Sequence, residues 1–65
     1  MNPLKVERIN KGLTQLEAAK KIGISYSTLT KLESNHKDAS KKTMVKFANF
    51  YNKSVDYLFF TTYNH

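Results

Sequence analysis

The chain has 65 residues, a formal net charge of +6 and no cysteine. A chain this short forms one small domain, which excludes a large catalytic cleft between domains. The lack of cysteine excludes disulfide bonds and thiolate zinc sites, and the longest apolar run, residues 57–60, is too short to span a bilayer.

The first predicted helix lies between two clear signals. Asn2 is a favourable N-cap, and Pro3 suits the first helical position. Gly12 ends the helix, with Lys11 in its last turn. The apolar residues that we expect in the core are Leu4, Ile9 and Leu13, whereas Val6 fits either side.

The second predicted helix is short and begins with a capping box. In the run 14–17, the hydroxyl of Thr14 accepts a backbone N–H, and Glu17 reaches back to the first backbone N–H. Ala18 and Ala19 are small enough to let another helix approach closely. Gly23 is expected to end this helix in the left-handed conformation.

The third predicted helix starts after Ser25, another favourable N-cap. Successive residues turn by about 100°, which divides the helix into two faces. Leu29 and Leu32 share one face. The opposite face is polar and consists of Tyr26, Ser27, Thr30, Lys31 and Ser34. Since serine and threonine are mediocre helix formers, this outward face indicates a function rather than a contribution to stability.

Two further helices follow a polar loop at residues 35–40. Ser40 caps a helix whose core stripe has helical spacing: Met44, Phe47, Ala48 and Tyr51. Asn52 ends that helix, and Ser54 caps a last short one, in which Val55, Leu58 and Phe59 close the core. We therefore predict an all-α, compact bundle of five short helices in one domain, residues 1–60, followed by a short tail at 61–65.

The basic charge is concentrated in the middle of the chain. Residues 20–42 contain six lysines and only two acidic residues. A clustered basic surface indicates a polyanionic partner such as nucleic acid. The alternative is that the lysines only keep a small protein soluble.

The second and third helices are joined by only residues 23–25, which is typical of a helix-turn-helix. With this spacing the chain resembles the lambda-repressor-like helix-turn-helix family, also called the Cro/cI or XRE family. The residues that carry the resemblance are Arg8, Gly12-Leu13-Thr14-Gln15, Glu17, Ala19, Gly23-Ile24-Ser25, Leu29, Leu32, Glu33, Phe47-Ala48 and Ser54-Val55-Asp56-Tyr57-Leu58. The resemblance covers about residues 3–59, nearly the whole chain.

The resemblance implies that double-stranded DNA is the partner and that the third helix, about residues 26–34, enters the major groove. The residues implied to read bases are Tyr26, Ser27, Thr30, Lys31 and Ser34. Gln15 is implied to contact phosphate and to brace the third helix. Arg8 and Glu33 are implied to form a structural pair that ties the first helix to the third. The loop residues implied to bind phosphate are Asn35, His36 and Lys37.

Elementary chemistry supports these roles. Lys31 can donate to guanine O6 and N7, and a threonine methyl group can touch the thymine methyl group. The backbone N–H groups at the starts of the second and third helices, beside Thr14 and Ser25, suit a phosphate. Lys41 and Lys42, together with Lys37, supply the salt-dependent part of the affinity.

Two positions depart from the family pattern. Ala18 stands where a leucine is usual, which thins the core there. Asn35 stands where a glycine often ends the third helix, and asparagine tolerates the left-handed conformation.

One recognition helix reads only a few base pairs, whereas two copies about 34 Å apart read a palindrome. We therefore expect a homodimer that acts as a sequence-specific transcriptional regulator, with repression as the expected direction. The expected dimer interface is the C-terminal segment, whose aromatic residues a small core does not fully bury: Tyr57, Phe59, Phe60 and Tyr63.

Other classes of function fit the sequence less well. The same scaffold occurs in antitoxins and in modules that bind another regulator, so a protein partner is the alternative interpretation. The sequence has no nucleophile–base pair of the kind that would indicate an enzyme. His36 and His65 lack the spacing of metal ligands. We expect no cofactor, metal, small-molecule ligand or membrane partner. Since the N-terminus lacks the apolar stretch of a signal peptide, we expect a cytoplasmic protein. The resemblance to the helix-turn-helix family implies a bacterial or phage origin.

Overall fold

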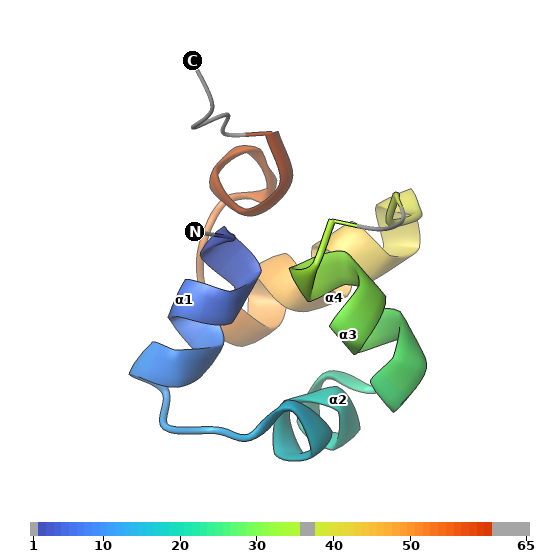
Figure 1. Cartoon of the computed structure of the whole chain (residues 1–65). Helices are drawn as coiled ribbons and strands as arrows, with labels where there is room; N and C mark the ends of the chain where they lie inside the picture. The colour runs from blue at the N-terminus through green and yellow to red at the C-terminus, as the bar shows by residue number, and fades with distance from the viewer. Residues whose placement is uncertain (1, 36–37, 61–65) are drawn as a thin grey trace.

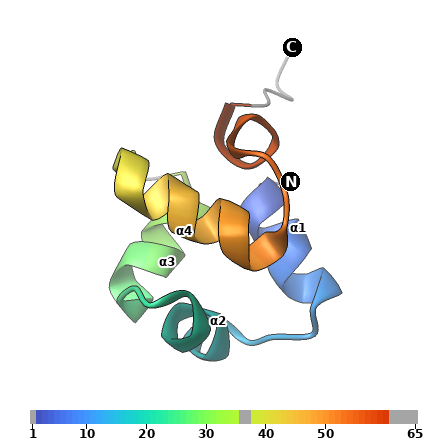
Figure 2. The same ribbon diagram turned by 180° about the vertical axis from the view of Figure 1, so that it is seen from behind.

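The computed structural model describes residues 2–35 and 38–60, which form five helices and no strand. The four α-helices are α1 (Pro3–Asn10), α2 (Gln15–Ile22), α3 (Tyr26–Glu33) and α4 (Lys41–Tyr51), and a short segment with wider, π-helical turns follows as η1 (Asp56–Phe60). In Figure 1, α4 passes behind α1 and α3, and Figure 2 shows it from the other side, in front of them. The predicted all-helical bundle is confirmed.

Local capping sets the helix boundaries. Each α-helix begins at the N-cap that the sequence indicated: Asn2, Thr14, Ser25 and Ser40. Each of these side chains accepts a hydrogen bond from a backbone N–H of the first turn. Gly23 and Asn52 end α2 and α4 in the left-handed conformation, with φ of 90° and 55°.

The core lies where the four α-helices meet η1. Its buried apolar side chains are Leu4, Ala18, Ala19, Ile22, Leu29, Leu32, Phe47, Tyr51 and Leu58. Phe47 is the largest fully buried side chain, and it packs edge-on against Phe59 with ring centroids 5.7 Å apart. Because α3 contributes its leucines to this core, its polar face is turned outward. No helix among the described residues has the length and apolar character needed to cross a membrane.

The prediction that Ile9 lies in the core is wrong, because its side chain is 51% exposed. Residues four apart lie on the same face of a helix, so Arg8 shares the inward face of α1 with Leu4. Arg8 is buried there, and Ile9, about 100° further around the helix, points to solvent. Leu13, beyond the helix, is only partly buried and packs at the edge of the core.

The hydroxyl group of Tyr51 is an exception to the rule that buried polar atoms are hydrogen-bonded. The residue is 4% exposed, and the described part of the chain offers its oxygen no hydrogen-bond partner. Burial raises the pKa of Tyr51 to about 12, because the charged phenolate is disfavoured away from water.

We expect Tyr51→Phe to raise the free energy of unfolding by about 1 kcal/mol, because it removes a buried polar atom that lacks a partner. The gain should grow at alkaline pH. The folded protein holds the Tyr51 proton more tightly than the unfolded chain, so the wild type loses stability as the pH rises from about 10 towards about 12. Urea unfolding of both proteins at neutral and at strongly alkaline pH measures the difference. A variant less stable than the wild type at neutral pH would contradict this account.

Candidate nucleic-acid interface

The face of α3 opposite its two leucines is open to solvent. Among the described residues, the side chain of Tyr26 is 51% exposed, and Ser27, Lys31 and Ser34 are also exposed. Thr30, between them, is half-buried. The structure therefore brings all the predicted base-reading residues together on one side of a single short helix.

The hydroxyl groups on this face are oriented by the helix backbone. Thr30 Oγ1 donates to the carbonyl of Ser27 at 3.0 Å, and Ser34 Oγ donates to the carbonyls of Thr30 and Lys31 at 3.0 and 3.1 Å. With their hydrogens turned inward, these oxygens offer lone pairs to the outside. The face therefore combines acceptors, which suit the amino groups of adenine and cytosine, with a lysine donor, which suits guanine.

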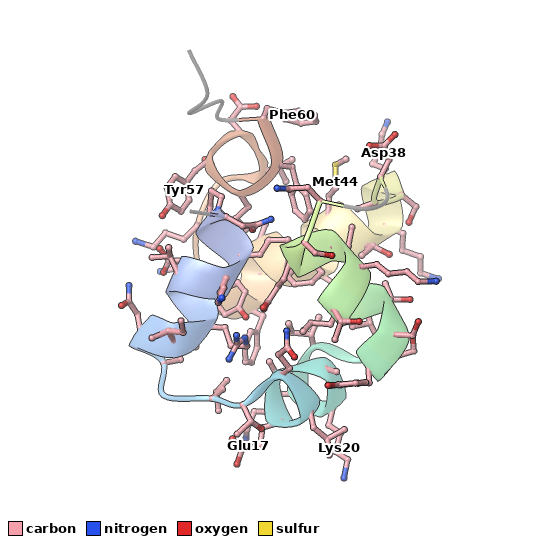
Figure 3. All side chains as sticks on the ribbon, viewed as in Figure 1. Glu17, Lys20, Asp38, Met44, Tyr57 and Phe60 are labelled. Atoms are coloured by element: carbon pink, nitrogen blue, oxygen red, sulfur yellow. The ribbon has the colours of Figure 1, made fainter. Side chains whose placement is uncertain are left out.

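The N-terminus of α2 is occupied by its capping box. Thr14 Oγ1 accepts from the N–H of Glu17 at 3.1 Å, and Glu17 Oε1 accepts from the N–H of Thr14 at 2.8 Å. The hydrogen bonds from Thr14 lower the pKa of Glu17, which keeps this carboxylate ionised. Figure 3 shows Glu17 at the outer edge of α2. The negative charge of Glu17 at the N-terminus of α2 repels a phosphate. The side chain of Gln15 is therefore a better candidate than Thr14 to donate a hydrogen bond to a phosphate.

The N-terminus of α3 is better suited to a phosphate. Ser25 Oγ accepts from the N–H of Thr28 at 3.0 Å, and the first turn of α3 holds no acidic residue. The N–H groups of Tyr26 and Ser27 lie at this positive end of the helix. The electrostatic field of the α3 N-terminus therefore favours the predicted phosphate contact at Ser25, whereas Glu17 opposes the contact predicted at Thr14.

The carboxylate of Glu33 joins three helices in the interior. Arg8 Nε donates to Glu33 Oε2 at 2.8 Å, and Arg8 Nη2 donates to Glu33 Oε1 at 3.1 Å. This is the predicted link between α1 and α3, and its hydrogen bonds raise the pKa of Arg8. Arg8 Nη1 also donates to the carbonyl of Leu13 at 2.9 Å, which holds the turn before α2. The position of α3 is thus fixed by a forked, buried ion pair.

Gln15 takes part in the same cluster from α2. Its Nε2 donates to Glu33 Oε1 at 3.1 Å. A carboxylate can only accept, so the amide of Gln15 must turn its nitrogen toward Glu33. The second N–H of this nitrogen remains to donate elsewhere, and Gln15 is only half-buried. Bracing of α3 by Gln15 is therefore present in the fold, and the predicted phosphate contact stays a prediction.

The remaining predicted phosphate residues lie around the loop after α3. Asn35 is exposed and has a φ of 63°, the left-handed conformation expected for it. Lys41 is exposed at the first position of α4. His36 and Lys37 lie outside the described residues.

Three of the four aromatic residues proposed for the dimer interface are described, and two of them are engaged within the chain. Tyr57 donates its hydroxyl hydrogen to Glu7 Oε2 at 3.0 Å, a bond that raises the pKa of Tyr57. Phe59 packs on the core. Phe60 is 58% exposed, and in Figure 3 it lies on the side of η1 opposite Tyr57. Tyr63 lies outside the described residues, so Phe60 is the strongest remaining candidate.

Sequence reasoning missed one residue near this surface. Asn2 caps α1 as predicted, but its amide nitrogen also donates to the carbonyl of Leu32 at 3.0 Å and to Asn35 Oδ1 at 2.9 Å. The only available signal was the amide itself, since asparagine, unlike serine or aspartate, brings two spare donors to an N-cap. Within the described residues, no group of three His, Asp or Glu side chains is placed to hold a metal ion.

Comparison with known proteins gives matches along most of the chain. Residues 4–58 match the model of a family described as helix-turn-helix. The chain is 42% identical over 55 residues to the HTH-type transcriptional regulator ImmR of Bacillus subtilis, a match that covers 85% of this chain and 43% of ImmR. It is 36% identical over 58 residues to the uncharacterized HTH-type transcriptional regulator MJ0272 of Methanocaldococcus jannaschii, which covers 89% of this chain and 88% of that protein. No solved structure matches the chain significantly.

Proposed function

Since this chain belongs to the helix-turn-helix family of the Cro/cI type, we propose that it is a sequence-specific regulator of transcription that binds double-stranded DNA. The observation that carries the proposal is the division of α3 into two faces. Its leucines anchor it in the core, and its polar residues face solvent along the length of the helix, as expected for a helix that meets base edges in the major groove. Both relatives are named as HTH-type transcriptional regulators.

Base readout is assigned to the outward face of α3, and backbone contacts are assigned to its surroundings. The base-reading residues are Tyr26, Ser27, Thr30, Lys31 and Ser34. The phosphate-binding residues are Thr14, Gln15, Ser25, Asn35, His36, Lys37 and Lys41, of which the capping box makes Thr14 the weakest. Phosphate contacts set the register of the protein on the duplex, and the α3 contacts supply the sequence preference.

A homodimer on a palindromic operator follows from the size of the reading surface. One helix of 8 residues reaches only a few base pairs, so a specific site requires two copies about 34 Å apart. Occupation of an operator that overlaps a promoter gives repression. The apolar surface offered for dimerisation is centred on Phe60.

We expect Phe60→Ala to weaken self-association by about tenfold, because the ring is exposed in one copy and becomes buried between two. Sedimentation equilibrium over a range of concentrations measures this. Val45→Ala on α4 is the matched control, since Val45 is likewise an exposed apolar residue, at 46%. Equal dimerisation of wild type and Phe60→Ala would move the interface elsewhere.

The proposed function is tested by selecting bound duplexes from a random pool at about 150 mM salt. Enrichment of a palindrome with half-sites one helical turn apart supports a dimeric, specific regulator. Binding without enrichment that vanishes as salt rises leaves only general affinity for polyanions. In that case the scaffold would serve a protein partner, such as a toxin or another regulator.

A further inference from the structure

Asn2 joins the start of α1 to the end of α3. The residue is 9% exposed, and its Oδ1 accepts from the N–H of Leu4 at 2.7 Å. Its Nδ2 uses both hydrogens, one on the carbonyl of Leu32 and one on Asn35 Oδ1. Figure 1 shows these two helix ends side by side. Both N–H groups of the Asn2 amide and one lone pair of its oxygen are thus hydrogen-bonded.

These partners leave the two amides only one arrangement. A backbone N–H can only donate and a backbone carbonyl can only accept, so the Asn2 amide cannot be reversed between Leu4 and Leu32. Asn2 therefore presents a donor to Asn35. The oxygen of the Asn35 side chain must receive it, which directs the Asn35 NH2 group away from Asn2.

Asn35 lies at the edge of the polar face of α3. It directly follows Ser34, the last residue of that face, and it is exposed. Its backbone N–H donates to the carbonyl of Leu32 at 3.2 Å, and its φ is 63°. Backbone and side chain are both held, so the NH2 group has a fixed position beside the surface assigned to DNA.

The choice of asparagine here has a chemical consequence. Glycine adopts the left-handed conformation with less strain, so the backbone alone would favour glycine. Asparagine adds a side-chain amide. Asn2 already occupies one lone pair of the amide oxygen, so the second lone pair and the two N–H donors of the nitrogen remain. A fixed NH2 donor suits an anionic acceptor such as a phosphate oxygen.

We propose that Asn2 is a positioning residue for DNA binding, which orients the Asn35 side chain so that its NH2 group donates to a phosphate of the DNA backbone. The inference rests on the proposed function and adds to it the residue that sets the geometry of one backbone contact. Asn2 itself does not touch the DNA.

A double-mutant cycle tests the proposal, with fluorescence anisotropy on the selected duplex and on random duplex. Asn35→Gly keeps the left-handed backbone and removes the donor, and we expect about tenfold weaker binding on both duplexes. Asn2→Ser keeps a good N-cap and removes the positioning donor, and we expect severalfold weaker binding. In the Asn35→Gly background, Asn2→Ser should have no further effect on affinity. The salt slope should stay unchanged in every variant, because no charge is removed.

Two outcomes overturn the inference while leaving the proposed function intact. Wild-type affinity in Asn35→Gly would show that Asn35 makes no contact. An equal loss from Asn2→Ser with and without the Asn35 side chain would show that Asn2 acts only through the general stability of the fold. Urea unfolding of each variant confirms that binding is measured on folded protein. Failure of the wild type itself to bind any duplex would instead refute the proposed function and this inference with it.

Discussion

Arg8→Ala is expected to destabilise the fold by about 3–5 kcal/mol, because it leaves the buried carboxylate of Glu33 without its cation. The Glu33 side chain is only 3% exposed, so water cannot replace the guanidinium. The carbonyl of Leu13 loses a donor in the same change. Folded domains are stable by only about 5–15 kcal/mol, and a domain this small belongs at the lower end. Most of the stability of this domain should therefore be lost.

Urea unfolding followed by helical circular dichroism measures the effect of Arg8→Ala. Lys5→Ala, an exposed change on the same helix, is the control and should alter stability by less than about 0.5 kcal/mol. Replacing both charges at once, with Arg8→Met and Glu33→Leu, should restore much of the stability, since no unpaired charge remains. A cost of less than about 1 kcal/mol for Arg8→Ala would show that Glu33 finds another partner or becomes protonated.

The ion pair also explains why α3 keeps its place. Glu33 is the last residue of α3, and it accepts from side chains on α1 and α2. Apolar packing alone is tolerant of small rotations, whereas forked hydrogen bonds are directional. The cluster therefore sets the rotation of the helix about its axis, which decides which side chains meet the DNA.

The sequence was sufficient for the features that depend on neighbouring residues. A cap, a left-handed helix end and the two faces of an amphipathic helix all arise within a few positions along the chain. For this reason the sequence predicts the helix ends at Thr14, Gly23 and Ser25 and the polar face of α3, all of which the structure has.

The features that the sequence did not predict depend on contacts between distant positions. Ile9 was expected in the core because it is apolar, whereas the inward position at the spacing of Leu4 belongs to Arg8, a charged residue that can be buried because Glu33, 25 positions away, pairs with it. The same holds for Tyr57, whose bond to Glu7 spans 50 positions and turns an expected interface residue toward its own chain. Asn2 was foreseen as a cap but not as a link to Asn35, 33 positions away.

Lys31→Ala is expected to weaken binding to the selected operator by about 1–3 kcal/mol per half-site and to relax discrimination at one base position. Lys31 lies in the last turn of α3, at the edge of its exposed polar face, where its ammonium group can reach guanine O6 and N7. Random duplex offers no fixed guanine at that position, so the loss there should be smaller. Anisotropy titrations against the operator and its single-base variants measure the effect.

Lys41→Ala provides the contrast that gives the Lys31 prediction its meaning. Lys41 is exposed at the start of α4, outside the reading face, and we assign it to phosphate. Its removal should weaken binding to all duplexes alike and lower the slope of log affinity against log salt by about 1. The two lysines carry the same charge, so electrostatics alone predicts the same behaviour for both variants. If Lys31→Ala loses the same affinity on operator and on random duplex, then Lys31 does not read a base and contributes to binding only through its charge.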